Sequence, residues 1–376
     1  MDGLSRTLIA LLLLAAVGAP MPAQLTERGV SSTGKLVFAH FMLAYPTGND
    51  QVGDYKGDIT RAQNYNIDGF ALNMGALPQD EAHNDYLLRA DKLYQAAAEL
   101  GTGFKLFISA DTSSLVDPVL IQHVVTRYAS HPNQLFYNGK QFLSTFLGQD
   151  APFDWQTQVL NPLSSSGNPV YFMPNFVVSG DHFLTMTIFL FEINNLDLAF
   201  RATRMCCLIN TRTLTEISNG FPGKYIRRCI SFVPRTCASQ LTHDLRLIHR
   251  MHTTPLSQDL SEDTLFRQYS TKAGKTFMQG IAPWFFCHLS DKNWGNIEDG
   301  HILVDKWESI LTNNPDFVEF VTWNDFSEST YVAPPNSVVV NRDYPWGNFD
   351  HTAFLELSSY YHLAFKTGQK PAITAS

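Results

Sequence analysis

Short apolar runs that recur at a nearly regular spacing constrain the fold of this chain more than any other feature. Successive runs begin roughly 28 to 37 residues apart, close to the length of about 30 residues that one strand and its crossover helix require. In the first half of the sequence the runs are Lys35–Phe41, Gly69–Asn73, Lys105–Ala110, Gln141–Phe146 and Pro169–Met173. The pattern predicts parallel strands joined by helices.

Helical patterns fill the intervals between these runs. Apolar residues recur at helical spacing in Asp58–Asn66, Asp80–Leu100 and Leu115–Tyr128. The alternation returns near the C-terminus, with strands expected at Thr276–Ile281 and Phe317–Thr322 and helices around Asp305–Leu311 and over His351–Lys366. These runs supply all but one of the strands of an α/β fold of the (β/α)8 TIM-barrel type, which forms a single domain. We therefore expect one barrel domain over residues 35–372.

Residues 181–250 interrupt the pattern where the sixth βα unit belongs. From Phe200 to Arg250 there are nine Lys/Arg against two Asp/Glu, and four of the five cysteines lie there: Cys206, Cys207, Cys229 and Cys237. Met186–Ile193 has the composition of a strand, but no complete βα unit follows it. A native insertion, a disulfide-held subdomain and non-native sequence such as a translated intron all remain open. We expect the sixth unit to be irregular or disrupted.

The N-terminus has the pattern of a secretory signal peptide over residues 1–23. Arg6 precedes the apolar run Leu8–Val17, and small or turn-forming residues follow it as far as Ala23. The run is too short to span a bilayer, which needs about 20 apolar residues. We therefore expect a protein that is secreted, extracellular or in the cell wall, with no membrane contact once the signal peptide is removed.

Charge and motif searches exclude several function classes. A formal net charge of -8 and a pI near 5.8 argue against a nucleic-acid partner, which needs a basic surface. The chain has no His-Glu-x-x-His, Gly-x-Ser-x-Gly or Gly-x-Gly-x-x-Gly motif, and Tyr269 stands where a phosphate loop ending in Gly274-Lys-Thr needs glycine. We expect no metal and no cofactor.

Polar residues near the ends of the predicted strands are the candidates for a functional site, because a parallel barrel gathers its active site at the carboxyl ends of the strands. They are His40, Asp68, Asn73, Asp111, Asn175, His288, Asn324, Asp325 and Glu328. Carboxylates and amides suit sugar hydroxyls, and glycosidic cleavage needs one protonated and one ionised carboxyl.

Tryptophan and histidine residues near these positions have two interpretations each. Trp284, Trp294 and Trp323 could stack on sugar rings, or they could belong to the barrel core or to helix packing. We expect Trp294 to be the best platform. His40 and His288 could bond substrate hydroxyls or serve the structure alone.

The segment Asp316–Thr330 carries a resemblance to glycoside hydrolase family 71, the fungal α-1,3-glucanases or mutanases. That family's last strand reads Pro-Asp-Phe-Val-Glu and is followed by Thr-Trp-Asn-Asp-Tyr-Gly-Glu-Ser, from which this chain departs at Phe326 and Ser327. Further blocks that resemble the family are Val37–Met42, Ile67–Asn73, Gly274–Met278, Ala282–Phe286 and Lys292–Trp294. The resemblance runs from about Lys35 to Asn175 and from about Asp263 to Ala372.

The resemblance implies a (β/α)8 barrel that hydrolyses α-1,3-glucan in endo fashion with inversion. Carried over by position, the catalytic acids are Asp325 and Glu328, with Asp68 as a third essential acid. We expect Glu328 to be the general acid and Asp325 the base that activates water, with their carboxyl groups about 6.5–9.5 Å apart. The other interpretation of Asp325 is a turn residue or helix cap, because Asn-Asp favours turns.

Other functions stay open because the family's strand-six block, with its Asp-Gly and Trp, is not recognisable between Asp181 and Arg250. A barrel that lacks one strand would expose strand edges. One alternative is a catalytically inactive relative that at most binds glucan. A further alternative is a retaining or exo-acting glycosidase that acts on another glucan.

Overall fold

The main sheet of the protein consists of parallel strands in barrel order. The computed structural model describes residues 34–75, 85–175, 189–191, 258–289, 293–296, 301–335 and 345–373. Parallel strands pair in the order β6–β5–β3–β2–β1–β11–β8. Their bounds are β1 (Leu36–Met42), β2 (Gly69–Met74), β3 (Lys105–Asp111), β5 (Lys140–Phe146), β6 (Val170–Met173), β8 (Phe277–Ile281) and β11 (Phe317–Phe320). The last parallel strand pairs with the first, as in a (β/α)8 barrel.

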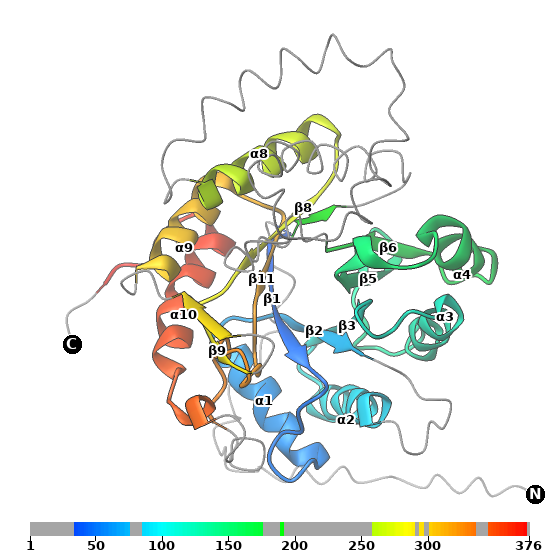
Figure 1. Ribbon diagram of the computed structural model, residues 1–376, viewed down its shortest axis with the longest axis horizontal. Helices are drawn as coiled ribbons and strands as arrows, with labels where there is room; N and C mark the ends of the chain where they lie inside the picture. Colours follow the sequence, from blue (N-terminus) through cyan, green and yellow to red (C-terminus); the bar gives the residue numbers. More distant parts are fainter. Residues whose placement is uncertain are drawn as a thin grey trace, which may run out of the picture.

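Helices surround this sheet (Figure 1). They include α1 (Val52–Asn64), α2 (Asp85–Leu100), α3 (Pro118–Arg127), α4 (Asn161–Ser165), α8 (Gln258–Lys272), α9 (Ile302–Asn313) and α10 (Thr352–Thr367). A π-helical turn, η3 (Gln156–Leu160), leads into α4, and short 3-10 turns form η2 (Gly148–Asp150) and η6 (Pro345–Asn348). None of the helices in the described part of the chain is long and apolar enough to cross a membrane.

Local hydrogen bonds explain where two of the helices begin. The Asp117 side chain accepts a 2.8 Å hydrogen bond from the Val119 N–H, and Pro118 occupies the first turn of α3. The carboxyl of Asp54 accepts a 3.0 Å hydrogen bond from the Gln51 N–H, which starts α1 at Val52. This helix therefore begins six residues before the predicted start at Asp58, because the capping contact outweighs the weak apolar pattern of its first turn.

The core has two layers that lie on opposite faces of the sheet. The outer layer joins the strands to the helices, and the buried Trp307 of α9 belongs to it. In the inner layer the ring centroid of Phe107 lies 5.0 Å from that of Phe38 and 4.7 Å from that of Phe142. Phe317 also packs in this inner layer. Removing one such buried ring would cost about 3–5 kcal/mol of folding free energy.

The interior becomes polar toward the carboxyl ends of the strands. Successive inward-facing residues of a strand lie two positions apart, so Phe38 is followed by His40 on β1 and Ala71 by Asn73 on β2. On β3 and β5, Ser109 and Ser144 follow Phe107 and Phe142, and their hydroxyls lie 3.2 Å apart. A site at this end of the sheet therefore has a polar floor above an apolar base.

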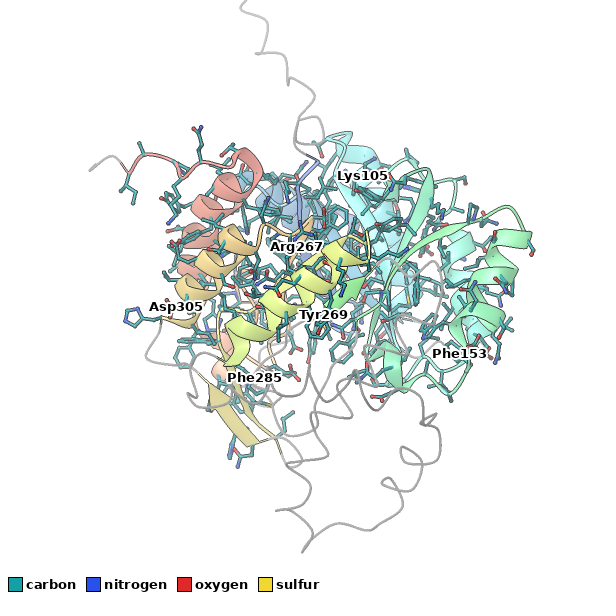
Figure 2. All side chains as sticks on the ribbon, turned by 90° about the horizontal axis from the view of Figure 1, so that it is seen from above. Lys105, Phe153, Arg267, Tyr269, Phe285 and Asp305 are labelled. Carbon is teal, nitrogen blue, oxygen red and sulfur yellow. The ribbon has the colours of Figure 1, made fainter. Side chains whose placement is uncertain are left out.

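Short antiparallel strands extend the sheet or stand apart from it. β4 (Phe136–Tyr137) pairs with β5, and β7 (Phe189–Phe191) pairs with β8. β9 (Phe285–His288) and β10 (Asn293–Asn296) form a separate hairpin. Figure 2 shows this hairpin projecting from the body of the molecule beyond Phe285.

The structure confirms the parallel strands predicted on both sides of the interruption, and the strand between them is irregular, as expected. β7 lies within the range proposed for that strand, but it runs antiparallel to β8 and is no parallel barrel strand. Within the described ranges, no strand pairing joins β6 to β7. Apart from β7, residues 181–250 lie outside the described residues, as does the signal-peptide pattern, so the explanations of the segment stay predictions.

Candidate active site

Asp325 and Glu328 lie on one hydrogen-bonded turn at the carboxyl end of β11. Asp325 Oδ1 accepts hydrogen bonds from the Ser327 hydroxyl at 2.8 Å and from the Glu328 N–H at 3.0 Å. The Asp325 N–H donates to Thr322 Oγ1 at 2.8 Å, and the Thr322 N–H donates to the Thr330 carbonyl at 3.0 Å. These bonds fix the backbone between the two acids. Asp325 therefore does act as a turn residue, while both acids stand where a barrel carries its active site.

Hydrogen bonds to β1 hold the start of this turn in place. The Trp323 N–H donates to the His40 carbonyl at 2.7 Å. The Asn324 side chain accepts from the Met42 N–H at 2.7 Å and donates to the Met42 carbonyl at 3.1 Å. Asn324 is 2 % exposed and uses both its amide groups in these bonds. Its side chain continues the pairing between β11 and β1, and its role in substrate binding stays a prediction.

A buried chain of polar side chains crosses the four neighbouring strands β11, β1, β2 and β3. His40 Nδ1 lies 2.7 Å from Glu319 Oε1, and His40 Nε2 lies 3.2 Å from Asn73 Nδ2. The same Asn73 nitrogen donates to Asp111 Oδ2 at 3.3 Å. Asp111 Oδ1 accepts from the Ser113 N–H and hydroxyl. The structure thus brings together three of the predicted residues, His40, Asn73 and Asp111.

Glu319 is a residue of this site that the sequence interpretation missed. It is 1 % exposed and faces the interior of the sheet from the middle of β11. The available signal was a carboxylate inside the otherwise apolar run Phe317–Phe320, because an ionisable side chain is almost never buried without a partner.

Asp68 lies at the opposite end of the sheet, so the expectation of a third catalytic acid is corrected. Its Oδ2 accepts from the Val37 N–H at 2.8 Å, and its Oδ1 lies 2.6 Å from Lys366 Nζ. Its carbonyl accepts from the Lys105 N–H, and Figure 2 shows Lys105 far from Phe285. Phe285 neighbours Phe286, whose N–H donates to the Glu328 carbonyl at 3.0 Å.

The position of Asp68 explains its electrostatics. Burial raises the pKa of Asp68, while the Lys366 ammonium and the Val37 N–H act against this rise. The residue begins β2 rather than ending it, and active-site residues of barrels come from strand ends on the other side. Asp68 is therefore a structural partner of α10.

Trp323 is a core residue, and its predicted role as a sugar platform is wrong. The side chain is fully buried and its ring centroid lies 5.2 Å from that of Phe70. Behind it, Asp58 on α1 accepts a 2.6 Å hydrogen bond from the Thr47 hydroxyl. Burial raises the pKa of Asp58 to about 6, although the hydrogen bond from Thr47 and the nearby Trp323 indole act to lower it.

The remaining predicted site residues lie in different parts of the fold. Trp284 packs its ring against His351 and Phe354 at centroid distances of 5.1 and 4.8 Å, which favours helix packing. Asn175 follows β6 and is 3 % exposed. The amide oxygen Oδ1 of its side chain has no hydrogen-bond partner among the described residues. His288 is exposed on the β9–β10 hairpin and lies 2.7 Å from Asn293 Oδ1. The Trp294 side chain lies outside the described residues, so its role stays a prediction.

An aromatic rim borders the turn and joins the predicted residue His288 to Phe286 and Trp346, which the sequence interpretation missed. We use this name for Phe286, His288 and Trp346. Trp346 Nε1 donates to the Ser327 carbonyl at 2.9 Å, and its ring centroid lies 5.7 Å from that of Phe286 and 6.3 Å from that of His288. Phe286 is 42 % exposed. The half-buried Trp346, fixed to the backbone of the turn, and the exposed Phe286 beside it have rings that suit the apolar face of a sugar.

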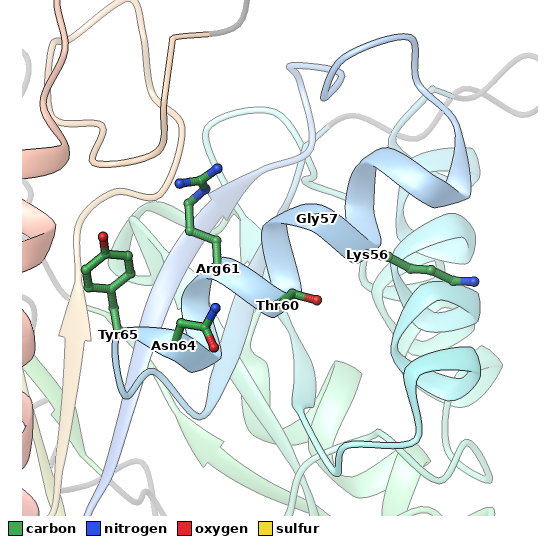
Figure 3. A pocket seen from close by; sticks show the side chains of 6 residues that line it. All are labelled: Lys56, Gly57, Thr60, Arg61, Asn64 and Tyr65. Carbon is green, nitrogen blue, oxygen red and sulfur yellow. The ribbon is translucent and has the colours of Figure 1, made fainter. Parts of the chain in front are cut away.

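A hollow of about 620 Å³ lies elsewhere, on the outer face of α1. It is lined by Lys56, Gly57, Thr60, Arg61, Asn64 and Tyr65. In Figure 3, Lys56 points away from Arg61 and Tyr65, so these side chains do not converge on one ligand. In the part of the chain that the structure describes, no group of His, Cys, Asp and Glu residues could hold a metal ion.

The chain is similar to a known protein family and to several known proteins. The model of "Glycosyl hydrolase family 71" matches residues 33–189 and 250–376. The chain is 31% identical over 351 residues to the glucan endo-1,3-alpha-glucosidase agn1 of Schizosaccharomyces pombe, covering 90% of this chain and 68% of that protein. It is 28% identical over 359 residues to the mutanase Pc12g07500 of Penicillium rubens, covering 94% and 66%.

Two further similarities concern the length of the chain and its fold. The ascus wall endo-1,3-alpha-glucanase of S. pombe is 26% identical over 334 residues, covering 84% of this chain and 63% of that protein. The chain thus spans roughly two thirds of the length of these relatives. Among solved structures, the GH99 endo-alpha-mannosidase of Bacteroides thetaiotaomicron has a TM-score of 0.52 at 11% identity, covering 88% of this chain and 97% of the other. That likeness concerns the fold alone.

Proposed function

Because the chain belongs to glycosyl hydrolase family 71, we propose that it cleaves α-1,3-glucan within the polysaccharide, with Asp325 and Glu328 as the catalytic carboxyls. Relatives named for endo-1,3-alpha-glucosidase and mutanase activity support the substrate class. One observation carries the proposal: a single hydrogen-bonded turn holds both acids at the polar end of the barrel interior.

The proposed reaction proceeds in one step with inversion. Glu328 gives its proton to the leaving glycosidic oxygen, while water attacks the anomeric carbon from the opposite face and Asp325 takes a proton from that water. Asp325 suits the role of base, because two hydrogen bonds to one carboxylate oxygen are the environment of an ionised group. No cofactor takes part in these proton transfers.

The proposed contacts to glucan come from the two sides of the turn. On the strand side, Asn73 and Asp111 offer amide and carboxylate groups to sugar hydroxyls, with His40 beneath them. On the hairpin side, Phe286 and Trp346 of the aromatic rim offer ring faces. An uncharged polysaccharide also fits the net charge of -8 better than a nucleic acid does.

We place this activity outside the cell or in the cell wall. The support is the signal-peptide pattern in residues 1–23, where Arg6 precedes the apolar run Leu8–Val17. Expressing the full chain in a fungal host and sequencing the N-terminus of protein from the medium would test secretion.

Hydrolysis of insoluble α-1,3-glucan tests the proposal directly. The purified chain should release reducing sugar, and the first product should have the inverted anomeric configuration by NMR. Glu328→Gln should lower turnover by about 10²–10⁴-fold, because the leaving oxygen loses its proton donor. The matched control is Glu308→Gln. Glu308 lies on the outer helix α9, where its carboxyl pairs with Lys370, and this variant should keep full activity. Normal turnover in Glu328→Gln would remove this residue from the mechanism.

Binding without hydrolysis is the second candidate function. The observation behind it is that the family match leaves residues 190–249 uncovered and that β7 runs antiparallel to its neighbour. If the pure chain sediments with α-1,3-glucan yet releases no reducing sugar, this alternative holds. Retention of the anomeric configuration, or release of single end units, would instead favour a retaining or exo-acting glycosidase.

A further inference from the structure

We infer that Glu319 is a positioning residue of this site, which acts by holding His40 in one tautomer with one ring orientation. The inference rests on the proposed function for its catalytic consequence. Glu319 and His40 are 1 % and 4 % exposed, and their Oε1 and Nδ1 atoms lie 2.7 Å apart. The two-carboxylate mechanism has no proton for Glu319 to move.

The hydrogen bonds at the other end of the chain assign the proton on His40. Asn73 turns its amide nitrogen toward Asp111 Oδ2, because a carboxylate accepts and cannot donate. The same nitrogen faces His40 Nε2 at 3.2 Å, so Nε2 must be the acceptor and carry no proton. The ring proton of a neutral His40 then lies on Nδ1 and is donated to Glu319. Two carboxylates at opposite ends thus orient the imidazole and the amide between them.

The backbone of His40 connects this chain to the catalytic turn. The His40 carbonyl accepts the Trp323 N–H at 2.7 Å, two residues before Asp325. The His40 side chain is also part of the floor that carries Asn73 and Asp111. Loss of the Glu319 carboxylate would free the ring to turn or to change tautomer. Asn73 could then reverse its amide, and the hydroxyl-binding face would change.

Folding alone gives no reason to keep this buried pair. Two buried polar groups must both be desolvated, and an apolar pair of similar volume is often as stable or more stable. The inner layer below the pair is apolar, and the ring centroids of His40 and Phe146 lie 6.4 Å apart. Replacing Glu319 alone leaves the His40 Nδ1–H without this acceptor, so a purely structural role predicts lower stability with kcat unchanged in the folded protein, whereas a positioning role predicts a lower kcat as well.

Two substitutions of Glu319 test whether its hydrogen bond to His40 matters, as distinct from its side-chain volume and its charge. Glu319→Gln keeps an acceptor for Nδ1–H and should retain kcat within about tenfold. Glu319→Met keeps volume without an acceptor, and its kcat should fall by about 100-fold, as expected when catalytic groups are misplaced. Asp263→Asn is the matched control, since Asp263 is fully buried and accepts from Gln279 on the outer face of β8. It should change stability but leave kcat within about twofold.

The tautomer of His40 is measured independently of activity. In NMR spectra of ¹⁵N-histidine-labelled protein without substrate, the Nδ1 of His40 should be protonated and its Nε2 unprotonated. The variant His40→Gln identifies which signals belong to His40. The wild-type pattern should persist in Glu319→Gln and be lost in Glu319→Met. A protonated Nε2 in the wild type, or normal kcat in a folded Glu319→Met, would overturn the inference. A wild-type chain that hydrolyses no glucan would count against the proposed function, while the tautomer measurement would still decide the assignment of His40.

Discussion

The Asn324 side chain forms two hydrogen bonds with the backbone of Met42, accepting from its N–H at 2.7 Å and donating to its carbonyl at 3.1 Å. In this way a side chain takes the place of backbone pairing just where β11 has ended. The next residue is Asp325, so the side chain that ends the strand pairing also fixes where the turn of Asp325 and Glu328 begins.

Asn324→Ala should therefore reduce both stability and turnover. It removes the acceptor of the half-buried Met42 N–H and one of the two donors to the Met42 carbonyl, which keeps the Tyr45 N–H, and this should cost about 1–3 kcal/mol. With the turn released from β1, kcat should fall by more than about tenfold. Denaturant unfolding and initial rates on α-1,3-glucan measure the two effects.

Asn133→Ala supplies the control for this prediction. Asn133 is also buried and donates to a backbone carbonyl, that of Phe104, at 2.9 Å, but it lies beside the amino end of β3. It should lose similar stability and keep its kcat. Equal losses of kcat in both variants would mean that Asn324 supports the fold and not the turn.

Asp68→Asn should lower stability without removing activity. The substitution breaks the 2.6 Å ion pair between Asp68 and Lys366 at the amino end of the sheet, far from the turn of Glu328. We expect a lower melting temperature, with kcat within about threefold of the wild type at a temperature where both proteins are folded. A loss of turnover comparable to that of Glu328→Gln would restore Asp68 to the catalytic residues and contradict our placement of it.

Periodicity in the sequence predicted the strands well because a parallel strand buried on both faces appears as a continuous apolar run. Gly69–Asn73, for example, became β2 with one added residue. The turn of Asp325 and Glu328 was also predictable, since a barrel places its active site after its strands. The antiparallel direction of β7 was not, because periodicity carries no information on strand direction.

Burial of individual side chains was harder to predict than the strands were. Asp68 and Asn73 flank the same strand, yet only the residue after the strand reaches the polar end of the interior. The sequence left Trp323 with two interpretations because composition cannot separate a core tryptophan from a sugar platform. Glu319 went unnoticed because its partner His40 lies 279 residues away in the sequence, a pairing that only the fold creates.

Trp346→Ala should weaken substrate binding more than it slows cleavage. Trp346 lies on the aromatic rim, where its indole donates to the Ser327 carbonyl at 2.9 Å, and it does not belong to the polar floor. Losing one stacking face should raise KM for long glucan about 5- to 20-fold, which corresponds to about 1–2 kcal/mol, with kcat changed less than about threefold. Kinetics on soluble α-1,3-oligosaccharides of increasing length test this split.

Phe136→Ala provides the comparison for the rim. Phe136 is 48 % exposed on β4, which pairs with the amino end of β5 and so lies at the opposite end of the barrel. This variant should show unchanged KM and kcat. If Trp346→Ala behaved in the same way, the aromatic rim would not be part of the substrate path.

Asp58 should make the stability of the protein depend on pH in the acidic range. Its pKa in the folded protein is about 6, against an ordinary value of 3.8, because it is buried behind Trp323. Between about pH 4 and pH 6 the folded state keeps a proton that the unfolded chain has lost. Stability must therefore fall as the pH rises through this window, by an amount on the order of 3 kcal/mol, and stay level above it.

Asp58→Asn should remove this contribution, because its amide oxygen can still accept the Thr47 hydroxyl and carries no charge at any pH. Melting temperatures of both proteins between pH 4 and pH 7 measure the difference, which should grow toward pH 6 in favour of the variant. The exposed Asp305 on α9 offers the control, and Asp305→Asn should follow the wild-type curve. Parallel curves for Asp58→Asn and the wild type would show that Asp58 keeps an ordinary charge despite its burial.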